Sequence, residues 1–393
     1  MIKNNQSVHK KRIESVFSGK EPDRIPLCEQ AFSSTVASKI LGHESLTGST
    51  DLHYYESCAW LLGESAHSEF VDKCYTDIVE LHKKLDFDIL FLPWMMHEKP
   101  SKRIDDSRIL YSSKNDDSWS ICKFDQKSHT YGVEQTSDQF DSYEEVDVFI
   151  RKTINEFNPA DINPAVDPLL LRAIREYGDE FEIAGSSGFA IPVQTGWLEA
   201  VAIDPELVST YIDIKVEEQL KNIEAQYNAG IRLINGGGDF AFNSGPIYSP
   251  FFFQKYIAPK WKRVFDKCHE LGMYYIFRSD GFLWPVSDHL FGKKLADAYY
   301  EVDYDAGMHF DDLRKNYPDL VLFGNVSCDL IVNGTIEQIK DRALECITAA
   351  YPRLVLGSSN SILHGSPVEN VLAIYETARN YRSKNKISES VDI

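Results

Sequence analysis

Short runs of β-prone residues recur along the chain, and most are followed by a stretch in which apolar residues have helical spacing. Eight such runs are found, at residues 25–29, 87–92, 181–185, 231–235, 274–277, 298–302, 320–324 and 353–357. The periodicity predicts helices over residues 53–85, 205–227, 250–271 and 335–350. Strands that alternate with such helices form a parallel sheet, and eight of them predict a closed (β/α)₈ barrel. A doubly wound open sheet is the alternative, but no strand is followed by a GxGxxG turn.

One region breaks this rhythm. Residues 103–139 alternate polar and β-prone positions and are punctuated by Asn115-Asp-Asp, which predicts a small antiparallel meander. We interpret it as an insertion of about residues 99–145 after the second strand. The chain is then one (β/α)₈ domain over residues 1–393, ending in a polar tail at residues 383–393.

Composition narrows the class of protein. The chain is 43% hydrophobic and 26% charged, as in globular proteins, and no run of 18 apolar residues predicts a membrane span. The apolar stretch at residues 13–17 is too short for a secretory signal, which favours a cytoplasmic protein. A net charge of -19 disfavours nucleic acid and anionic lipid as partners. Seven cysteines without a CxxC pair argue against a disulfide framework or a zinc knuckle. A homodimer is left open.

The candidate chemistry lies where strands end. The apolar run 274–277 stops at Arg278 and Asp280, and parallel-sheet enzymes present catalytic groups at this end of a strand. A structural ion pair is the alternative. Asp239 follows three glycines at the end of the fourth predicted strand. Glycines there allow a ligand to approach the backbone closely, and the alternative is a tight turn in which Asp239 caps a helix. Asp88 lies inside an apolar run, so it is either a functional carboxylate or the acceptor of a buried structural hydrogen bond.

Several short motifs together resemble the uroporphyrinogen decarboxylase-like proteins. In chain order they are Glu21-Pro-Asp-Arg-Ile-Pro-Leu27, Phe87-Asp-Ile-Leu-Phe-Leu-Pro93, Gly238-Asp-Phe, Ser249-Pro-Phe-Phe-Phe, Arg278-Ser-Asp-Gly, Gly324-Asn-Val and Gly357-Ser-Ser-Asn-Ser-Ile. The resemblance runs from about residue 15 to residue 382. It implies a (β/α)₈ fold with the site at the carboxyl-terminal mouth, and it places Asp88 at the position of the family's catalytic aspartate.

The resemblance also separates two chemistries. True decarboxylases hold a polycarboxylate porphyrinogen with an arginine-rich loop after the first strand, but here that loop reads Glu29-Gln-Ala-Phe-Ser-Ser34. The other branch comprises methyltransferases that serve corrinoid proteins, many with zinc held by a His-x-Cys pair and a later Cys. In this chain Arg278 and Asp280 replace the pair, and Asn360 stands near the third position. Arginine is not a metal ligand, so thiol-activating zinc is not expected. A hard-ligand site of Asp239, Asp280 and Asn360 stays open.

These observations favour the methyltransferase I (O-demethylase) component of a corrinoid system. It would pass methyl from a phenyl methyl ether to the cob(I)alamin of a corrinoid partner protein. We expect Asp280 and Arg278 to assist the leaving oxygen, with Asp88 and Asp239 beside them at the barrel mouth. The residues expected to bind substrate are Phe240, Phe282, Trp284, Asn325, Asn360 and Ser361. The alternatives are a decarboxylase, a zinc-dependent methylcobamide:thiol methyltransferase and a non-catalytic barrel that binds a ligand.

Overall fold

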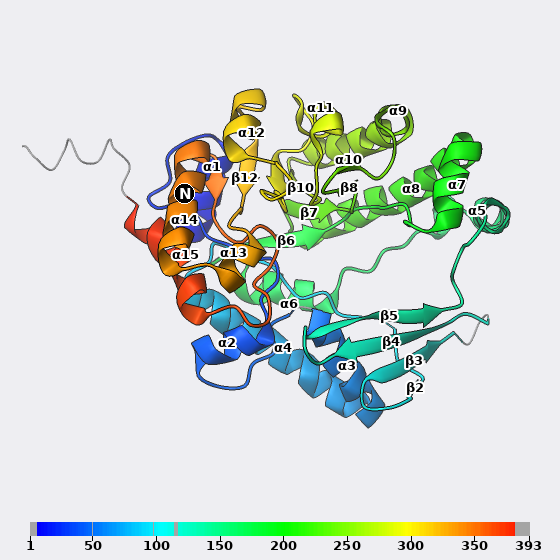
Figure 1. Cartoon of the computed structure of the whole chain (residues 1–393), viewed down its shortest axis with the longest axis horizontal. Coiled ribbons are helices and arrows are strands. Elements are labelled where there is room, and N and C mark those ends of the chain that lie inside the picture. The colour runs from blue at the N-terminus through cyan, green and yellow to red at the C-terminus, as the bar shows by residue number, and fades with distance from the viewer. Residues whose placement is uncertain (1–5, 49, 97, 114–116, 382–393) are drawn as a thin grey trace, which may run out of the picture.

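A curled parallel sheet forms the centre of the protein. The computed structural model describes residues 6–48, 50–96, 98–113 and 117–381. The sheet has seven strands in the order β1, β6, β7, β10, β11, β12, β13, and every neighbouring pair is parallel. The strands are β1 (Ile89–Leu90), β6 (Glu182–Ser186), β7 (Leu233–Gly237), β10 (Tyr274–Arg278), β11 (Ala298–Tyr300), β12 (Val321–Phe323) and β13 (Leu354–Val355). Seven of the eight predicted strands are therefore confirmed (Figure 1).

The remaining predicted strand, residues 25–29, is not formed as a strand. Leu27 makes one parallel bridge with Leu356, and the Asp88 N–H donates to the Leu27 carbonyl at 2.8 Å. The segment thus reaches both edge strands, but Pro26 has no N–H to contribute to a ladder. The α/β class and the parallel sheet are confirmed, while a closed eight-stranded barrel is not shown.

Two clusters of buried apolar side chains pack against the parallel sheet. The inward-facing layer contains Ile89, Ala184, Leu233, Ile276, Ala298, Val321 and Val355. Helix α1 (Val8–Phe17) adds Ile13, Val16 and Phe17 to the same cluster, and Phe17 stacks at 4.4 Å on Tyr274, the first residue of β10. Helix α1 therefore covers the amino ends of the strands. A second and larger cluster fills the space between the sheet and the surrounding helices.

The predicted helices form with two interruptions. The expected helix at residues 53–85 is divided into α3 (Thr50–Leu62) and α4 (Glu64–Leu85) by Gly63, whose φ of +117° suits only glycine. The expected helix at residues 250–271 is α9 (Pro250–Phe252), a π-helical turn (Phe253–Ile257) and α10 (Ala258–Glu270). Helix α8 (Pro205–Ala229) begins as predicted, because the Asp204 side chain accepts from the N–H of Leu207. Helix α14 (Ile336–Ala350) follows its capping Thr335.

The other elements connect or cover these. The helices are α2 (Ser34–Leu41), α5 (Tyr143–Glu156), α6 (Pro168–Tyr177), α7 (Thr195–Ile203), α11 (Asp288–Phe291), α12 (Phe310–Asn316), α13 (Cys328–Asn333) and α15 (Val368–Asn380), with 3₁₀ turns at Pro159–Asp161 and Trp284–Val286. Strands β8 (Ala241–Phe242) and β9 (Gly245–Pro246) form a short hairpin. No helix in the described part of the chain is long and apolar enough to cross a membrane.

The predicted antiparallel insertion is present between β1 and α5. It consists of β2 (Lys102–Arg103), β3 (Arg108–Ser112), β4 (Trp119–Asp125) and β5 (Thr130–Thr136), paired in that order. In Figure 1 this sheet lies apart from the parallel sheet, beside α3. Tyr54 of α3 stacks on Phe124 of β4 at 4.4 Å, so the insertion has an apolar contact of its own with the helical layer. The predicted tail lies outside the described residues.

Candidate functional site

A cavity of about 690 Å³ opens at the carboxyl ends of the parallel strands. Asn235 of β7, Arg278 at the end of β10 and Glu301 just after β11 form part of its wall. The apolar part of the wall includes Phe32, Leu52, Phe91, Leu92, Pro93, Trp94 and Leu363. Ser128 and Thr130, at the turn between β4 and β5, also reach it. A cavity with mostly apolar walls and a few converging polar groups is the usual form of a small-molecule site.

The polar end of the cavity is a connected set of side chains. Arg278 Nη1 lies 3.3 Å from Glu301 Oε1, and Gln30 Nε2 donates to the same oxygen at 2.6 Å. Asn235 Nδ2 in turn donates to Gln30 Oε1 at 3.3 Å. The Arg278 guanidinium also lies 4.4 Å over the ring of Trp94. These five residues come from five separate segments of the chain, and the contacts with Glu301 and Trp94 hold the guanidinium plane in one orientation.

Two buried polar atoms in this set have no hydrogen-bond partner within the protein. They are Asn235 Oδ1 and Arg278 Nε. Leaving a buried polar atom unpaired costs about 1–3 kcal/mol, so such atoms are uncommon unless water or a ligand binds them. One acceptor and one donor on residues of the cavity wall are therefore buried without a partner in the protein.

Glu301 has an unusual backbone conformation. Its φ is +59°, a region that residues with a side chain rarely adopt. Such a conformation costs of the order of 1–3 kcal/mol and persists where surrounding contacts impose it. Here both Arg278 and Gln30 hold the Glu301 carboxylate. Strain of this kind is typical of functional sites.

Asp280 lies two residues beyond Arg278 and is half-buried, but it does not form part of the cavity wall. Burial is the largest cause that raises its pKa from 3.8 to about 6, and the negative charges of Glu301, Asp239 and Asp303 add to the shift. Asp239 itself is exposed. Arg278, Asp280 and Asp239 are thus near one another at the carboxyl ends, as predicted.

Asp88 is not with them, and this expectation was wrong. It immediately precedes β1, so in the parallel sheet it lies at the amino end of a strand, whereas Arg278 closes the carboxyl end of β10. Its carboxylate has no exposed area and accepts from Arg12 at 3.0 Å, Arg24 at 2.8 Å and the Leu27 N–H at 2.9 Å. These bonds neutralise a buried charge and join α1 to the sheet, which is a structural role.

The predicted substrate-binding residues divide into two groups. Asn360 and Ser361 form part of the cavity wall. Phe240 is fully buried among aromatic rings that include Trp261, at 5.8 Å, so it belongs to the core. Asn325 is also fully buried, where it accepts from Arg342 Nη2 at 2.6 Å. Phe282 and Trp284 are half-buried outside the cavity wall, and Trp284 Nε1 donates to the Gly307 carbonyl at 3.0 Å. For these four the expectation of a place in the cavity was wrong.

Three polar residues of the site were missed: Gln30, Asn235 and Glu301. Each had a signal in the sequence, because each lies at the end of a predicted strand or within two residues of it. Polar residues at the carboxyl ends of the predicted strands are therefore the sequence signal for this site.

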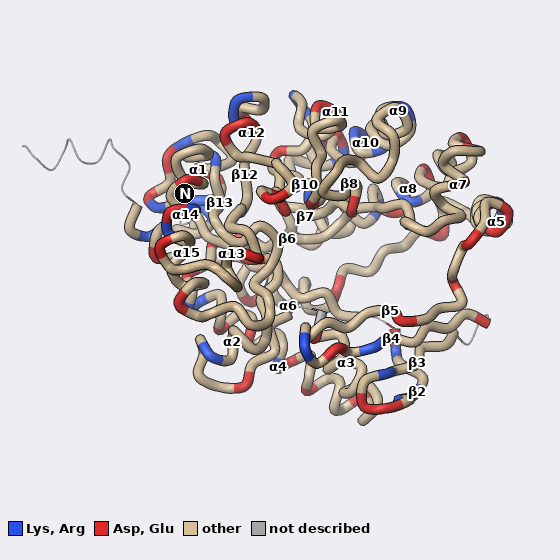
Figure 2. The backbone as a smooth tube through the Cα atoms, viewed as in Figure 1, with Lys and Arg blue, Asp and Glu red and all other residues tan. Residues whose placement is uncertain are grey.

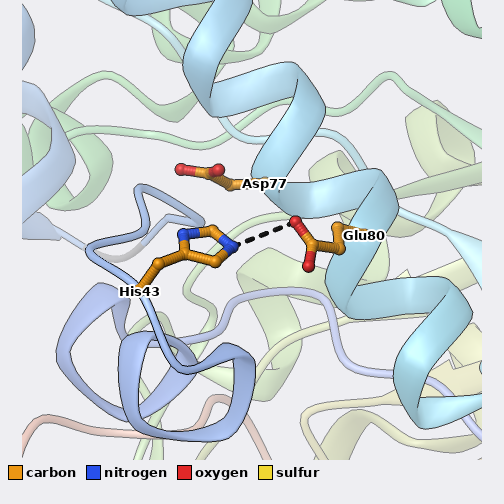
Figure 3. A group of neighbouring side chains, drawn as sticks. All are labelled: His43, Asp77 and Glu80. Carbon is orange, nitrogen blue, oxygen red and sulfur yellow. Dashed lines mark hydrogen bonds and ion pairs between the residues drawn. The ribbon is translucent and has the colours of Figure 1, made fainter.

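The donor atoms at the cavity do not suit a thiol-activating zinc ion. No cysteine forms part of the wall, and Arg278 cannot be a ligand. Among the described residues, the ligand atoms of His43, Asp77 and Glu80 lie within 4.8 Å of one another (Figure 3). This group is not part of the cavity wall, His43 and Glu80 are exposed, and Asp77 already accepts from Lys73 Nζ at 2.9 Å and the Leu46 N–H at 2.7 Å.

Two comparisons with known proteins agree with the α/β fold described above. The uroporphyrinogen decarboxylase (URO-D) family model matches residues 193–381, which include five of the seven parallel strands. Residues 193–381 are therefore similar to the URO-D family, and the predicted resemblance to that superfamily is confirmed. No curated protein sequence matches the chain significantly.

A methyltransferase from Methanosarcina mazei is similar to the whole chain in structure. The TM-score is 0.64 at 15% sequence identity, and the match covers 95% of this chain and 99% of that one. The two proteins therefore share a fold. A D-psicose 3-epimerase matches at 12% identity over 65% of this chain and 93% of its own, with a TM-score of 0.30. A sugar phosphate isomerase/epimerase from Parabacteroides distasonis matches at 10% identity over 85% and 94%, also with a TM-score of 0.30. Scores of this size support no inference.

Proposed function

We propose that this protein is a methyltransferase of a corrinoid-dependent system. It takes the methyl group from a phenyl methyl ether in the cavity and delivers it to the cob(I)alamin of a corrinoid partner protein. The shared fold with the methyltransferase from Methanosarcina mazei supports the methyltransferase class. The ether and the corrinoid are inferred from the chemistry of the site and from the family resemblance.

The observation that carries the proposal is the composition of the cavity wall. It is largely apolar and contains Trp94 and Phe91, which suits an aromatic ring. It holds one arginine, and Glu301 already pairs with it. A polycarboxylate porphyrinogen would require several unpaired cations, so decarboxylation of that substrate is poorly supported. A thiol-methylating zinc site is poorly supported by the donor atoms described above.

In this reaction the protein has to stabilise and protonate the ether oxygen as it leaves the methyl group. The bond between the ether oxygen and the methyl carbon breaks, its electron pair stays on oxygen, and a phenolate develops. The corrinoid supplies the nucleophile whose electron pair forms the new bond to the methyl carbon. Arg278, which forms part of the cavity wall, would donate a hydrogen bond from its guanidinium to that oxygen. Asp280 lies two residues beyond Arg278 and outside the cavity wall, so with its pKa raised to about 6 it would supply the proton through an intervening water.

An anaerobic assay tests this proposal. The protein is mixed with cob(I)alamin and a panel of methoxylated aromatics, and formation of methylcobalamin is followed by its absorbance. We expect methylcobalamin and one equivalent of the corresponding phenol. Release of carbon dioxide from carboxylated substrates, without methyl transfer from any ether, would instead support the decarboxylase alternative.

A further inference from the structure

We propose that the cavity selects a neutral or cationic ligand that carries a hydrogen-bond donor, and that Glu301 excludes carboxylates. This inference rests on the proposed function only for the choice of an aromatic ether as the ligand. The charge preference itself follows from the cavity wall and can be measured by binding alone.

The wall is acidic in the part of the chain that the structure describes. Glu29, Glu301 and Asp329 line the cavity, although burial raises the pKa of Glu29 to about 7, and Arg278 is the one lysine or arginine among the lining residues. Of the lining histidines, His82 and His364 have pKa values lowered chiefly by burial, to about 4 for His82, so neither adds a positive charge at neutral pH. Further acidic positions lie close to β7, β8 and β10 in Figure 2.

Arg278 cannot easily serve as the binding site for a carboxylate. Its Nη1 is 3.3 Å from Glu301 Oε1, and its guanidinium carbon is 4.4 Å from the Trp94 ring centre. Gln30 fixes Glu301 from the other side at 2.6 Å. The Glu301 side chain is only 6% exposed, so solvent screens its charge weakly. A ligand carboxylate would have to displace Glu301 or lie beside it, and like charges in close contact are strongly unfavourable.

Asn235 also favours a ligand with a hydrogen-bond donor, independently of the charge of Glu301. The residue is only 7% exposed, it forms part of the cavity wall, and its Oδ1 has no hydrogen-bond partner. Its Nδ2 is engaged by Gln30 Oε1, which fixes the amide orientation. A buried acceptor on a residue of the cavity wall, close to the Glu301 carboxylate, suits a hydroxyl or ammonium donor on a ligand that packs against this wall.

Three ligands of matched size test the preference: 2-(4-methoxyphenyl)ethanol, 2-(4-methoxyphenyl)ethylamine and 4-methoxyphenylacetate. Their dissociation constants are measured by isothermal titration calorimetry without any corrinoid, so failure of methyl transfer does not affect the result. We expect the alcohol and the amine to bind at least about tenfold more tightly than the acetate, a difference of about 1.4 kcal/mol. Tightest binding by the acetate, or no binding by any of the three, would overturn the proposal.

The Glu301→Gln variant assigns the effect to one residue. It keeps the side-chain shape and an oxygen for Gln30, but it removes the charge and releases Arg278. We expect acetate binding to improve about tenfold and amine binding to weaken. Glu270→Gln, at the exposed end of α10, removes one charge elsewhere and should leave the ranking unchanged. An unchanged ranking in Glu301→Gln would overturn the role given to Glu301. The wild-type series still tests the charge preference if that variant fails to fold.

Discussion

Arg278 Nη1 lies 3.3 Å from Glu301 Oε1, and the two residues stand at the carboxyl ends of the adjacent strands β10 and β11. Because both side chains form part of the cavity wall, their ion pair defines its polar end. Glu301 and the Trp94 ring hold the guanidinium in one orientation, and Arg278 Nε is buried without a partner in the protein. The proposed chemistry can be tested at each contributing group.

Arg278→Lys should lower the rate of methyl transfer strongly. Lysine keeps the charge but loses the planar guanidinium, the Nε donor and the stacking on Trp94. Loss of one preorganised donor to a developing oxyanion costs roughly 10²–10³-fold in rate. Steady-state kinetics measure the effect, with Arg175→Lys on the exposed face of α6 as the matched control. Equal rates for the two variants would contradict the role of Arg278.

Asp280→Asn should lower the rate by ~10²–10⁴-fold if Asp280 is the general acid. The loss should be larger for ethers with poor leaving groups, since these depend more on protonation. In the wild type the rate should fall as the pH rises through about 6, because the acid must carry its proton. Asp179→Asn, in an exposed turn, is the control. Near-normal turnover of an unactivated ether by Asp280→Asn would exclude Asp280 as the acid.

The raised pKa of Asp280 also predicts a pH-dependent stability. Below about pH 4 the carboxyl is protonated in both folded and unfolded chains, so its ionisation contributes no difference. Between 3.8 and about 6 the unfolded chain loses this proton while the folded chain keeps it. The wild type should therefore lose stability relative to Asp280→Asn across this window, and the difference should be constant at higher pH. Urea unfolding of both proteins from pH 4 to pH 8 measures it. A difference independent of pH would show that the pKa of Asp280 is not raised.

Asp88→Asn should affect stability and leave the chemistry intact. Removing one partner of a buried ion pair typically costs about 3–5 kcal/mol, and Arg12 and Arg24 would both lose this partner. Asp86→Asn is a close control, because Asp86 pairs with Arg24 at 2.9 Å but is 48% exposed, where a pair contributes about 0–1 kcal/mol. Urea unfolding and turnover per folded molecule give the two readouts. Normal stability with abolished turnover would restore the catalytic role that the family resemblance implied.

The contrast between Asp88 and Arg278 shows what the sequence could predict. Periodicity located seven strands correctly, because burial on both faces leaves continuous apolar runs. The same pattern placed Arg278 directly after the apolar run 274–277, at the carboxyl end of a strand. Asp88 is the second residue of its run, at the entry to the strand, so its position already indicated the amino end.

The direction of side chains after a strand was not predictable in the same way. Phe240 and Asn325 both follow strand ends, yet Phe240 packs against Trp261 and Asn325 binds Arg342. These partners lie on helices 21 and 17 residues further along the chain, and the pattern around the strand end does not predict such contacts. For Gln30 and Glu301 the sequence indicates the location but not the contact. Both lie close to the ends of predicted strands, but the hydrogen bond of 2.6 Å between them joins segments 271 residues apart.

The most direct test of the central claim follows the methyl group itself. The protein is incubated anaerobically with cob(I)alamin and 2-(4-methoxyphenyl)ethanol that carries a trideuterated methoxy group, and both products are quantified by mass spectrometry. The account predicts trideuteromethylcobalamin and the corresponding phenol in equal amounts, with little of either in Arg278→Lys. Unlabelled methylcobalamin, or an intact ether after prolonged incubation with this and other neutral methoxy aromatics, would contradict it.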